Sequence, residues 1–139
     1  MRKTILALAT LVSLAACKSQ PRISAQLMER NLGKALFEFN RALNAGYGDQ
    51  ARLYVAPEAT ADYDKMLAGG REKRYNFFFA DEAPKIDYLA GEADVREHLF
   101  WGSYTTDPTP KPNAKEVEVQ IHKWKFDEGA WRWHGQALH

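Results

Sequence analysis

The sequence contains a single cysteine, Cys17, among its 139 residues. One cysteine cannot form an internal disulfide, so hydrophobic burial has to stabilise the folded chain. The chain also has no large excess of charge of either sign. It contains 19 lysines and arginines and 18 aspartates and glutamates, which gives a formal net charge of +1. A balance so close to neutral argues against nucleic acid as a partner and against electrostatic binding to anionic lipid.

Catalytic and phosphate-binding motifs are missing as well. No serine lies in a Gly-x-Ser-x-Gly pattern, and Gly69-Gly70 lacks the lysine and the spacing of a phosphate-binding loop. The stretch from Thr4 to Ala16 is also shorter than the ~20 apolar residues that a transmembrane helix needs. The sequence therefore points to no enzyme class through a motif.

What is present is concentrated around Cys17. Arg2 and Lys3 precede a short apolar stretch, and small residues then lead to a possible cleavage site, which is the layout of a secretory signal peptide. The segment Leu14-Ala15-Ala16-Cys17 resembles the lipobox of bacterial lipoproteins. That resemblance implies a diacylglyceryl group on the Cys17 thiol, cleavage before this residue and acylation of the new amine. The alternative is an ordinary signal peptide followed by an incidental cysteine.

The lipoprotein resemblance also predicts a location. Two lipid signals already give stable anchoring, so three acyl chains would keep the protein on its membrane. In lipoproteins of enteric-type bacteria, an aspartate after the cysteine retains the protein in the inner membrane. Lys18 stands there in this chain, which favours the outer membrane, facing the periplasm. We expect a signal peptide at residues 1–16, a lipidated tether at 17–22 and a single α+β domain at 23–139.

The first half of this domain is predicted to be helical. Apolar residues recur every three to five positions over residues 23–45, which is typical of an amphipathic helix, and Gly46 would follow its end. Two shorter helices are expected over residues 49–55 and 57–68. We expect Gly69-Gly70 to stop the last of them.

The second half changes to the two-residue period of strands. Residues 74–79 and 85–88 are expected to form one interrupted strand or two short ones. From residue 93 onward the alternation becomes regular. The residues expected on one face are Ala93, Val95, Leu99 and Trp101, and those on the other are Asp94, Arg96, His98 and Phe100.

A further strand is predicted over residues 113–126, before a closing hairpin. Its apolar face is expected to hold Val117, Val119 and Ile121, with Glu116, Glu118, Gln120 and His122 on the polar face. Trp124 then falls out of register, which suggests a bulge near Lys123. Asp127-Glu128-Gly129 predicts a tight turn into the last strand, residues 131–138. The proline-rich loop at 105–114 is either a rigid connection or a recognition arm.

Helices followed by an antiparallel meander indicate an α+β domain. We expect a long N-terminal helix and two short helices packed on a curved antiparallel sheet of about four strands. The closing hairpin runs from Val117-Glu118-Val119-Gln120-Ile121 through Asp127-Glu128-Gly129 to Trp131-Arg132-Trp133. With the order of the elements, it resembles the nuclear transport factor 2-like (cystatin-like) fold over residues 23–139. This fold hosts both enzymes and non-catalytic binding domains.

Enzymes of this fold, such as ketosteroid isomerases and dehydratases, place acids or bases inside the cone. The candidates here are Asp87, Tyr88, His98, His122 and His134. At most one of Asp87 and Tyr88 should point inward, because neighbouring strand residues face opposite ways. We expect His98 and His122 on solvated polar faces and His134 opposite the strand's two tryptophans.

Metal binding has little support in the sequence. His122 and His134 could face each other across the last hairpin, but a structural zinc site usually needs four ligands, and His139 is terminal. We therefore predict no metal, no cofactor and no catalytic residue, and Cys17 as the single modified site.

Aromatic residues are the remaining clue. Neighbouring aromatics such as Phe77-Phe78-Phe79 and Phe100-Trp101 cannot all lie on one sheet face, so some should be exposed or covered by another element. They would form either a core packed on the first helix or a groove for an apolar ligand, a peptide or a partner.

Together these observations predict a membrane-anchored envelope lipoprotein whose domain is a non-catalytic binding or scaffolding module facing the periplasm. Its partners would be the membrane, through acyl chains on Cys17, and an envelope protein or apolar ligand, but no nucleic acid. The alternative is a small enzyme acting on an apolar substrate inside the cone. A third possibility is that the protein is a structural partner in an envelope complex. In that case the aromatic residues that point outward should form a flat patch.

Overall fold

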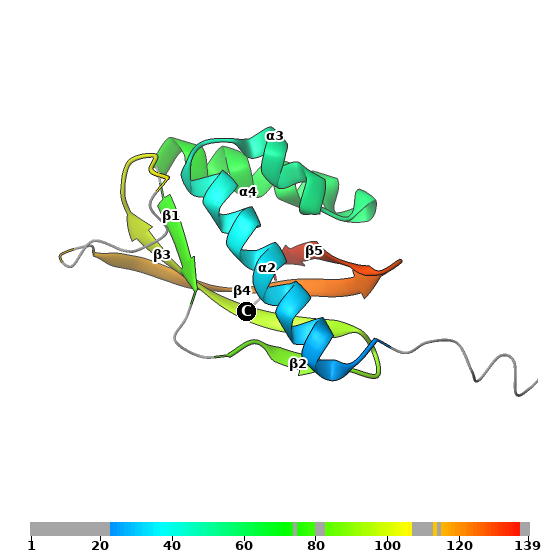
Figure 1. The fold of residues 1–139 in the computed structure, drawn as a ribbon. Coiled ribbons are helices and arrows are strands. Elements are labelled where there is room, and N and C mark those ends of the chain that lie inside the picture. Colours follow the sequence, from blue (N-terminus) through cyan, green and yellow to red (C-terminus); the bar gives the residue numbers. More distant parts are fainter. Residues whose placement is uncertain (1–22, 74, 80–82, 107–112, 114, 137–139) are drawn as a thin grey trace, which may run out of the picture.

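The computed structural model describes residues 23–73, 75–79, 83–106, 113 and 115–136. The predicted signal peptide, the tether and most of the proline-rich loop lie outside these residues. Within them, helices cover one side of a curved antiparallel sheet, and the long helix α2 crosses the concave face (Figure 1). The predicted α+β class is confirmed. None of the described helices combines the length and the apolar character needed to cross a bilayer.

Helix α2 spans Ala25–Asn44. The Ser24 side chain caps its start by accepting the Leu27 backbone N–H at 3.2 Å, which satisfies one of the amides that a helix start leaves unpaired. Gly46 follows its end with a φ of +83°, as expected for a glycine past a helix C-terminus. The buried stripe of this helix comprises Met28, Leu32, Leu36, Phe39, Asn40 and Leu43.

The shorter helices form a second layer next to α2. Helix α3 (Gly48–Ala51) continues into the 3-10 turn η1 (Arg52–Tyr54), and the 3-10 turn η2 (Pro57–Ala59) leads into α4 (Thr60–Lys73). The predicted stop at Gly69-Gly70 is wrong, because α4 continues past both glycines. Glycine inside a helix costs only about 1 kcal/mol relative to alanine, so it does not by itself end a helix.

The sheet contains β1 (Tyr75–Phe79), β2 (Lys85–Asp87), β3 (Glu92–Trp101), β4 (Glu116–Asp127) and β5 (Ala130–Gln136). The order is β1-β3-β4-β5, and every pairing is antiparallel. Strand β1 pairs with the second half of β3 and β2 with the first three residues of β3. They follow one another along the same edge as two separate short strands, which is the second of the two predicted alternatives.

An aromatic cluster joins the sheet to the helices. Phe39 of α2, Tyr63 of α4, Trp124 of β4 and Trp133 of β5 are all fully buried. The ring of Phe39 lies 5.2 Å from that of Trp124 in an edge-on arrangement, and Tyr63 lies 6.0 Å from Trp133, also edge-on. Such pairs stabilise a core beyond their burial alone. For these residues the packed-core interpretation is confirmed.

The predicted faces of β4 are wrong. Gln120, His122 and Trp124 are buried on the concave side, whereas Val119 and Ile121 lie half-buried on the opposite side. Strand β4 pairs with β3 without interruption from Glu118 to Lys125, so its residues alternate strictly. Burying the large Trp124 side chain therefore brings His122 and Gln120 to the inside as well.

On β3, Ala93, Val95 and Leu99 face inward as predicted, but Trp101 remains half exposed. The register between β3 and β4 shifts after Leu99, and Trp101 is the last residue of its strand. Glu97, which stands between Val95 and Leu99 on the inner face, is fully buried.

A bulge interrupts the closing hairpin where it was expected, between His122 and Trp124. The extra residue belongs to β5, however, because Trp133 pairs with Trp124 and Gln136 with His122. Gly135 lies inside this bulge with a φ of +112°. The predicted tight turn is confirmed, since both of its central residues, Glu128 and Gly129, have positive φ angles.

The conformation of Gly135 leads to a stability prediction. A side chain at φ +112° is strained, so Gly135→Ala should lower the free energy of unfolding by about 1–3 kcal/mol. Gly33→Ala is the matched control. Its new methyl group would meet nothing within 4 Å in the middle of α2, so it should stabilise the protein by about 0.5–1 kcal/mol. Urea unfolding of both variants checks the opposite signs, and equal effects would contradict this account.

Candidate functional site

A layer of polar side chains lies within the apolar interior. Asn40 comes from α2, Glu97 from β3, and Gln120 and His122 from β4, and all four are buried. Glu97 and Gln120 are direct partners in the β3–β4 register, and His122 follows two residues after Gln120 on the same face. The concave side of the sheet therefore brings an acid, a base and two amides together.

Glu97 is held by the amide of Asn40. The Asn40 Nδ2 group donates to both carboxyl oxygens, at 3.1 Å to Oε1 and 3.0 Å to Oε2. Burial raises the pKa of Glu97 to about 8, and these hydrogen bonds offset only part of the increase. At neutral pH the side chain is therefore mostly the uncharged acid, which is the form that an apolar interior accommodates.

His122 belongs to a chain of hydrogen bonds that runs along β4. The Trp133 indole Nε1–H donates to His122 Nδ1 at 3.2 Å. Because an indole nitrogen only donates, Nδ1 carries no proton, and Nε2–H donates to Gln120 Oε1 at 3.0 Å. Gln120 Nε2 in turn donates to the exposed Glu118 carboxylate at 3.4 Å. The structure thus fixes the tautomer of a neutral imidazole, and burial lowers the pKa of His122 to about 3.

Two polar atoms of the interior have no hydrogen-bond partner among the described residues. These are the Oδ1 acceptor of Asn40 and the indole Nε1 donor of Trp124. A buried polar group without a partner costs about 1–3 kcal/mol. The free acceptor belongs to the same Asn40 side chain whose Nδ2 group binds Glu97.

The predicted candidates on the β2 side lie on the surface. Asp87 is exposed, and its Oδ1 accepts the backbone N–H groups of Leu89 and Ala90 at 3.1 and 3.0 Å. Tyr88 is also exposed and donates its hydroxyl proton to Glu29 of α2. Neither points into the interior, so their role in this structure is to shape the turn after β2.

The histidines are separated. His98 pairs with Glu116 at the sheet surface, and His134 lies with its Nε2 3.6 Å from Glu58 Oε1. The prediction that His134 faces away from Trp131 and Trp133 is confirmed by the alternating burial of β5. The prediction that His122 is solvated is wrong, because His122 lies on the same buried face of β4 as Trp124.

Metal ligation across the last hairpin has no geometric basis. His122 is paired with Gln136 in the register, so it does not face His134, and its Nδ1 is occupied by Trp133. In the part of the chain that is described, no three His, Cys, Asp or Glu side chains gather closely enough to hold a metal ion. Cys17 lies outside the described residues.

Sequence analysis missed Glu97 and Asn40. The signal for Glu97 was available, because it occupies the inward position between Val95 and Leu99 in a regular alternation. Asn40 follows Leu36 by four residues and precedes Leu43 by three, so it lies on the buried stripe of α2. Acidic and amide side chains are mostly exposed in proteins, so the residue types at these two positions do not predict burial.

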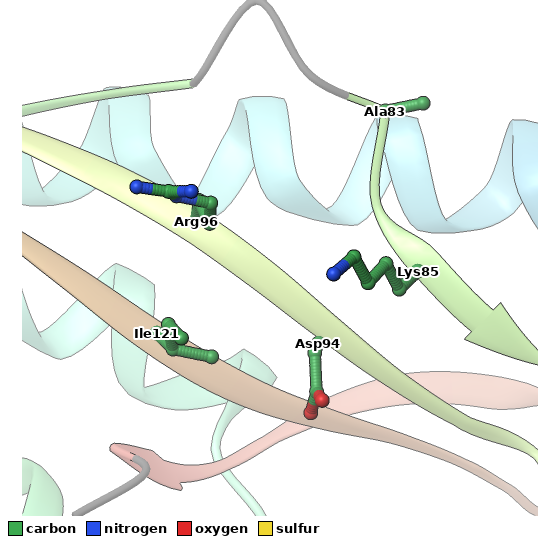
Figure 2. A pocket seen from close by; sticks show the side chains of 5 residues that line it. All are labelled: Ala83, Lys85, Asp94, Arg96 and Ile121. Carbon is green, nitrogen blue, oxygen red and sulfur yellow. The ribbon is translucent and has the colours of Figure 1, made fainter. Parts of the chain in front are cut away.

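A pocket of about 110 Å³ lies on the other face of the sheet. Figure 2 shows its lining, which is Ala83, Lys85 of β2, Asp94 and Arg96 of β3, and Ile121 of β4, with α2 behind the strands. It is smaller than the ~300 Å³ at which small-molecule pockets usually begin. It is also separated from Glu97 and His122 by the sheet itself, and none of the described residues that line it is aromatic.

Comparisons with known proteins identify the fold. No family model matches the sequence, and no curated protein matches it either. An NTF-2 like protein of unknown function from Shewanella oneidensis has a similar structure, with a TM-score of 0.53 and 12% identity over 77% of this chain and 94% of that one. A putative polyketide cyclase from Xanthomonas campestris gives a TM-score of 0.49 and 13% identity over 81% of this chain and 93% of that chain. At these identities the first likeness shows the fold alone, and the predicted nuclear transport factor 2-like fold is confirmed.

Glu97 and His122, which are both fully buried, predict an unusual pH dependence of stability. Glu97 ionises near pH 4.5 in the unfolded chain but near 8 in the folded one, so stability falls as pH rises from 4.5 to 8. His122 gains a proton near pH 6.5 when unfolded but only near 3 when folded, so stability falls as pH drops from 6.5 to 3. Between 4.5 and 6.5 the two effects cancel, which predicts maximal stability there.

Urea unfolding between pH 4 and 9 measures this profile. Above pH 6.5 the decline should approach about 1.4 kcal/mol per pH unit, the limit for one proton. Glu97→Gln should abolish the decline, whereas Glu92→Gln, at an exposed position of the same strand, should retain it. A wild-type stability that does not decrease between pH 6.5 and 8 would contradict the burial of Glu97.

Proposed function

We propose that this protein is a lipid-anchored envelope lipoprotein whose nuclear transport factor 2-like domain faces the periplasm as a non-catalytic binding or scaffolding module. The anchor is Cys17, and Lys18 favours the outer membrane. The anchor is inferred from the sequence around Cys17, and the non-catalytic role from the complete burial of Glu97 and His122.

The anchor is supported by the convergence of independent features on one residue. The basic start, the short apolar stretch and the small residues all lead to Cys17, the single cysteine of the chain. The folded domain follows closely, because Ser24 already caps α2 seven residues later. Such a short spacer fits a domain held near its membrane.

The burial of Glu97 and His122 supports the proposal that the domain is non-catalytic. Both side chains have a solvent exposure of 0%. Each ring nitrogen of His122 is already engaged, one by Trp133 and the other by Gln120. A general base must reach a proton of its substrate within hydrogen-bond distance, and this imidazole has no nitrogen left for that contact.

One observation favours the alternative, a small enzyme acting on an apolar substrate inside the cone. Glu97 is an acid with a raised pKa on the concave face, beside the free acceptor of Asn40. Enzymes often raise the pKa of a carboxyl group in this way to obtain a proton donor. This function requires the interior to open to solvent, which makes the two proposals separable.

Lipid attachment is tested on the full chain expressed in a Gram-negative bacterium with an alkyne-tagged palmitate. The wild type should incorporate the label, and the lipoprotein signal peptidase inhibitor globomycin should leave a larger, uncleaved form. Cys17→Ala should lose the label, because no other thiol is present. Lys18→Asp should retain the label but shift from the outer to the inner membrane on a sucrose gradient. Label that persists in Cys17→Ala would refute the anchor.

Access to the interior is tested by hydrogen exchange of the indole N–H groups. If the interior stays closed, the Trp133 Nε1–H should exchange only through global unfolding, with the denaturant dependence of the whole domain. An enzyme that admits substrate must open more readily, so its Trp133 indole would exchange faster than global unfolding allows. Exchange measured by NMR across sub-denaturing urea distinguishes these cases, with the half-exposed Trp101 as a reference.

A further inference from the structure

The chain between Cys17 and the folded domain is short. Ile23, the first described residue, follows Cys17 by six positions, and an extended chain spans at most about 3.6 Å per residue, so the two are no more than about 22 Å apart. If acyl chains hold Cys17 at the bilayer, the start of α2 has to lie within that distance of the membrane surface.

The turn between β2 and β3 lies at the same end of the domain as the start of α2 (Figure 1). Tyr88 in this turn joins the two by donating its hydroxyl proton to Glu29 of α2. The other end of α2 is distant, because a helix of 20 residues is about 30 Å long. Tyr47, which follows that far end, therefore lies much farther from the tether.

The end near the tether exposes large apolar side chains. Leu89 is 99% exposed, Leu27 41%, Tyr88 40% and Ile23 37%. A single exposed leucine is ordinary on a protein surface. Four exposed apolar residues around the point where a lipidated tether would enter are a feature that a membrane surface can explain. We call these four residues the tether end.

Hydrogen bonds fix the turn that presents Leu89. The Asp87 side chain accepts the N–H groups of Leu89 and Ala90, and its backbone oxygen accepts that of Gly91 at 2.9 Å. Gly91 in turn accepts the Phe126 N–H at 2.7 Å. Because the backbone of this turn is already fixed, inserting Leu89 into another phase requires ordering of its side chain alone.

We propose that the tether end rests on the lipid bilayer, with Leu89 and Tyr88 inserted into its interfacial layer. The inference rests on the proposed function, because it takes acylated Cys17 as the anchor. Removing the leucine side chain from water is favourable, tyrosine is enriched at membrane interfaces, and the anchor keeps both at high local concentration. Glu29 and Asp87, which accept hydrogen bonds in this region, are acidic, so the contact depends on apolar insertion and not on attraction to anionic headgroups.

The acylated full chain offers a direct test, because its lipidated cysteine leaves Leu89→Cys with a single free thiol. An environment-sensitive nitrobenzoxadiazole label at position 89 is examined in vesicles of phosphatidylethanolamine and phosphatidylcholine. We expect a blue-shifted emission that doxyl-labelled lipids quench and that 0.5 M salt leaves unchanged. Tyr47→Cys is the control, and its label should remain aqueous and unquenched, because Tyr47 is also surface-exposed, at 51%, but lies at the far end of α2.

The mass of the purified protein separates the two possible failures. A protein that carries no acyl mass refutes the proposed function and this inference together. An acylated protein whose label at position 89 stays aqueous refutes only the membrane contact. A blue shift without lipid quenching would mean that another protein or a second copy covers this surface, which also overturns the inference.

Discussion

The burial of Trp133 determines most of the interior. Its ring packs on Phe39 of α2 and Tyr63 of α4, and its indole N–H donates to His122 of β4. Its backbone oxygen also accepts the Ala56 N–H at 3.0 Å, which ties β5 to the segment between η1 and η2. One residue therefore contacts both helical layers and the neighbouring strand. A change in its position would have to move all of these elements together.

The polar layer follows from this packing. Trp124 and Trp133 are paired in the β4–β5 register, so both indoles lie on the concave face. Strict alternation then places His122 and Gln120 on that face, whatever their polarity. The interior accepts them because Trp133 and Gln120 satisfy both nitrogens of the imidazole and leave it neutral. The burial of the two tryptophans thus decides which face of β4 points inward, and hydrogen bonds satisfy the polar groups that are buried as a result.

Much of the fold could be predicted from the sequence. The stripe of α2, the two short edge strands and the turn at Glu128-Gly129 each depend on local pattern, which a single sequence contains. On β4, by contrast, apolar residues lie on both faces, with Val119 and Ile121 on one and Trp124 on the other. Which face is buried depends on which of these sets gains more from burial. Local alternation does not predict this, because the answer depends on the side chains of α2 and β5 that pack on the strand. The contact between Glu97 and Asn40, 57 residues apart, could not be predicted for the same reason.

The raised pKa of Glu97 supports a catalytic role only if the carboxyl group stays dry when a substrate enters. Its pKa is high because the carboxyl group is removed from water, and burial is the largest cause of the shift. An interior that opened to admit a substrate would let water reach the carboxyl group and would lower that pKa. The closed domain thus has a neutral acid that solvent cannot reach, and an open one would have an accessible but ionised carboxylate. A catalytic role for Glu97 therefore requires a substrate that itself excludes water, so that its apolar surface replaces the contacts that now keep Glu97 dry.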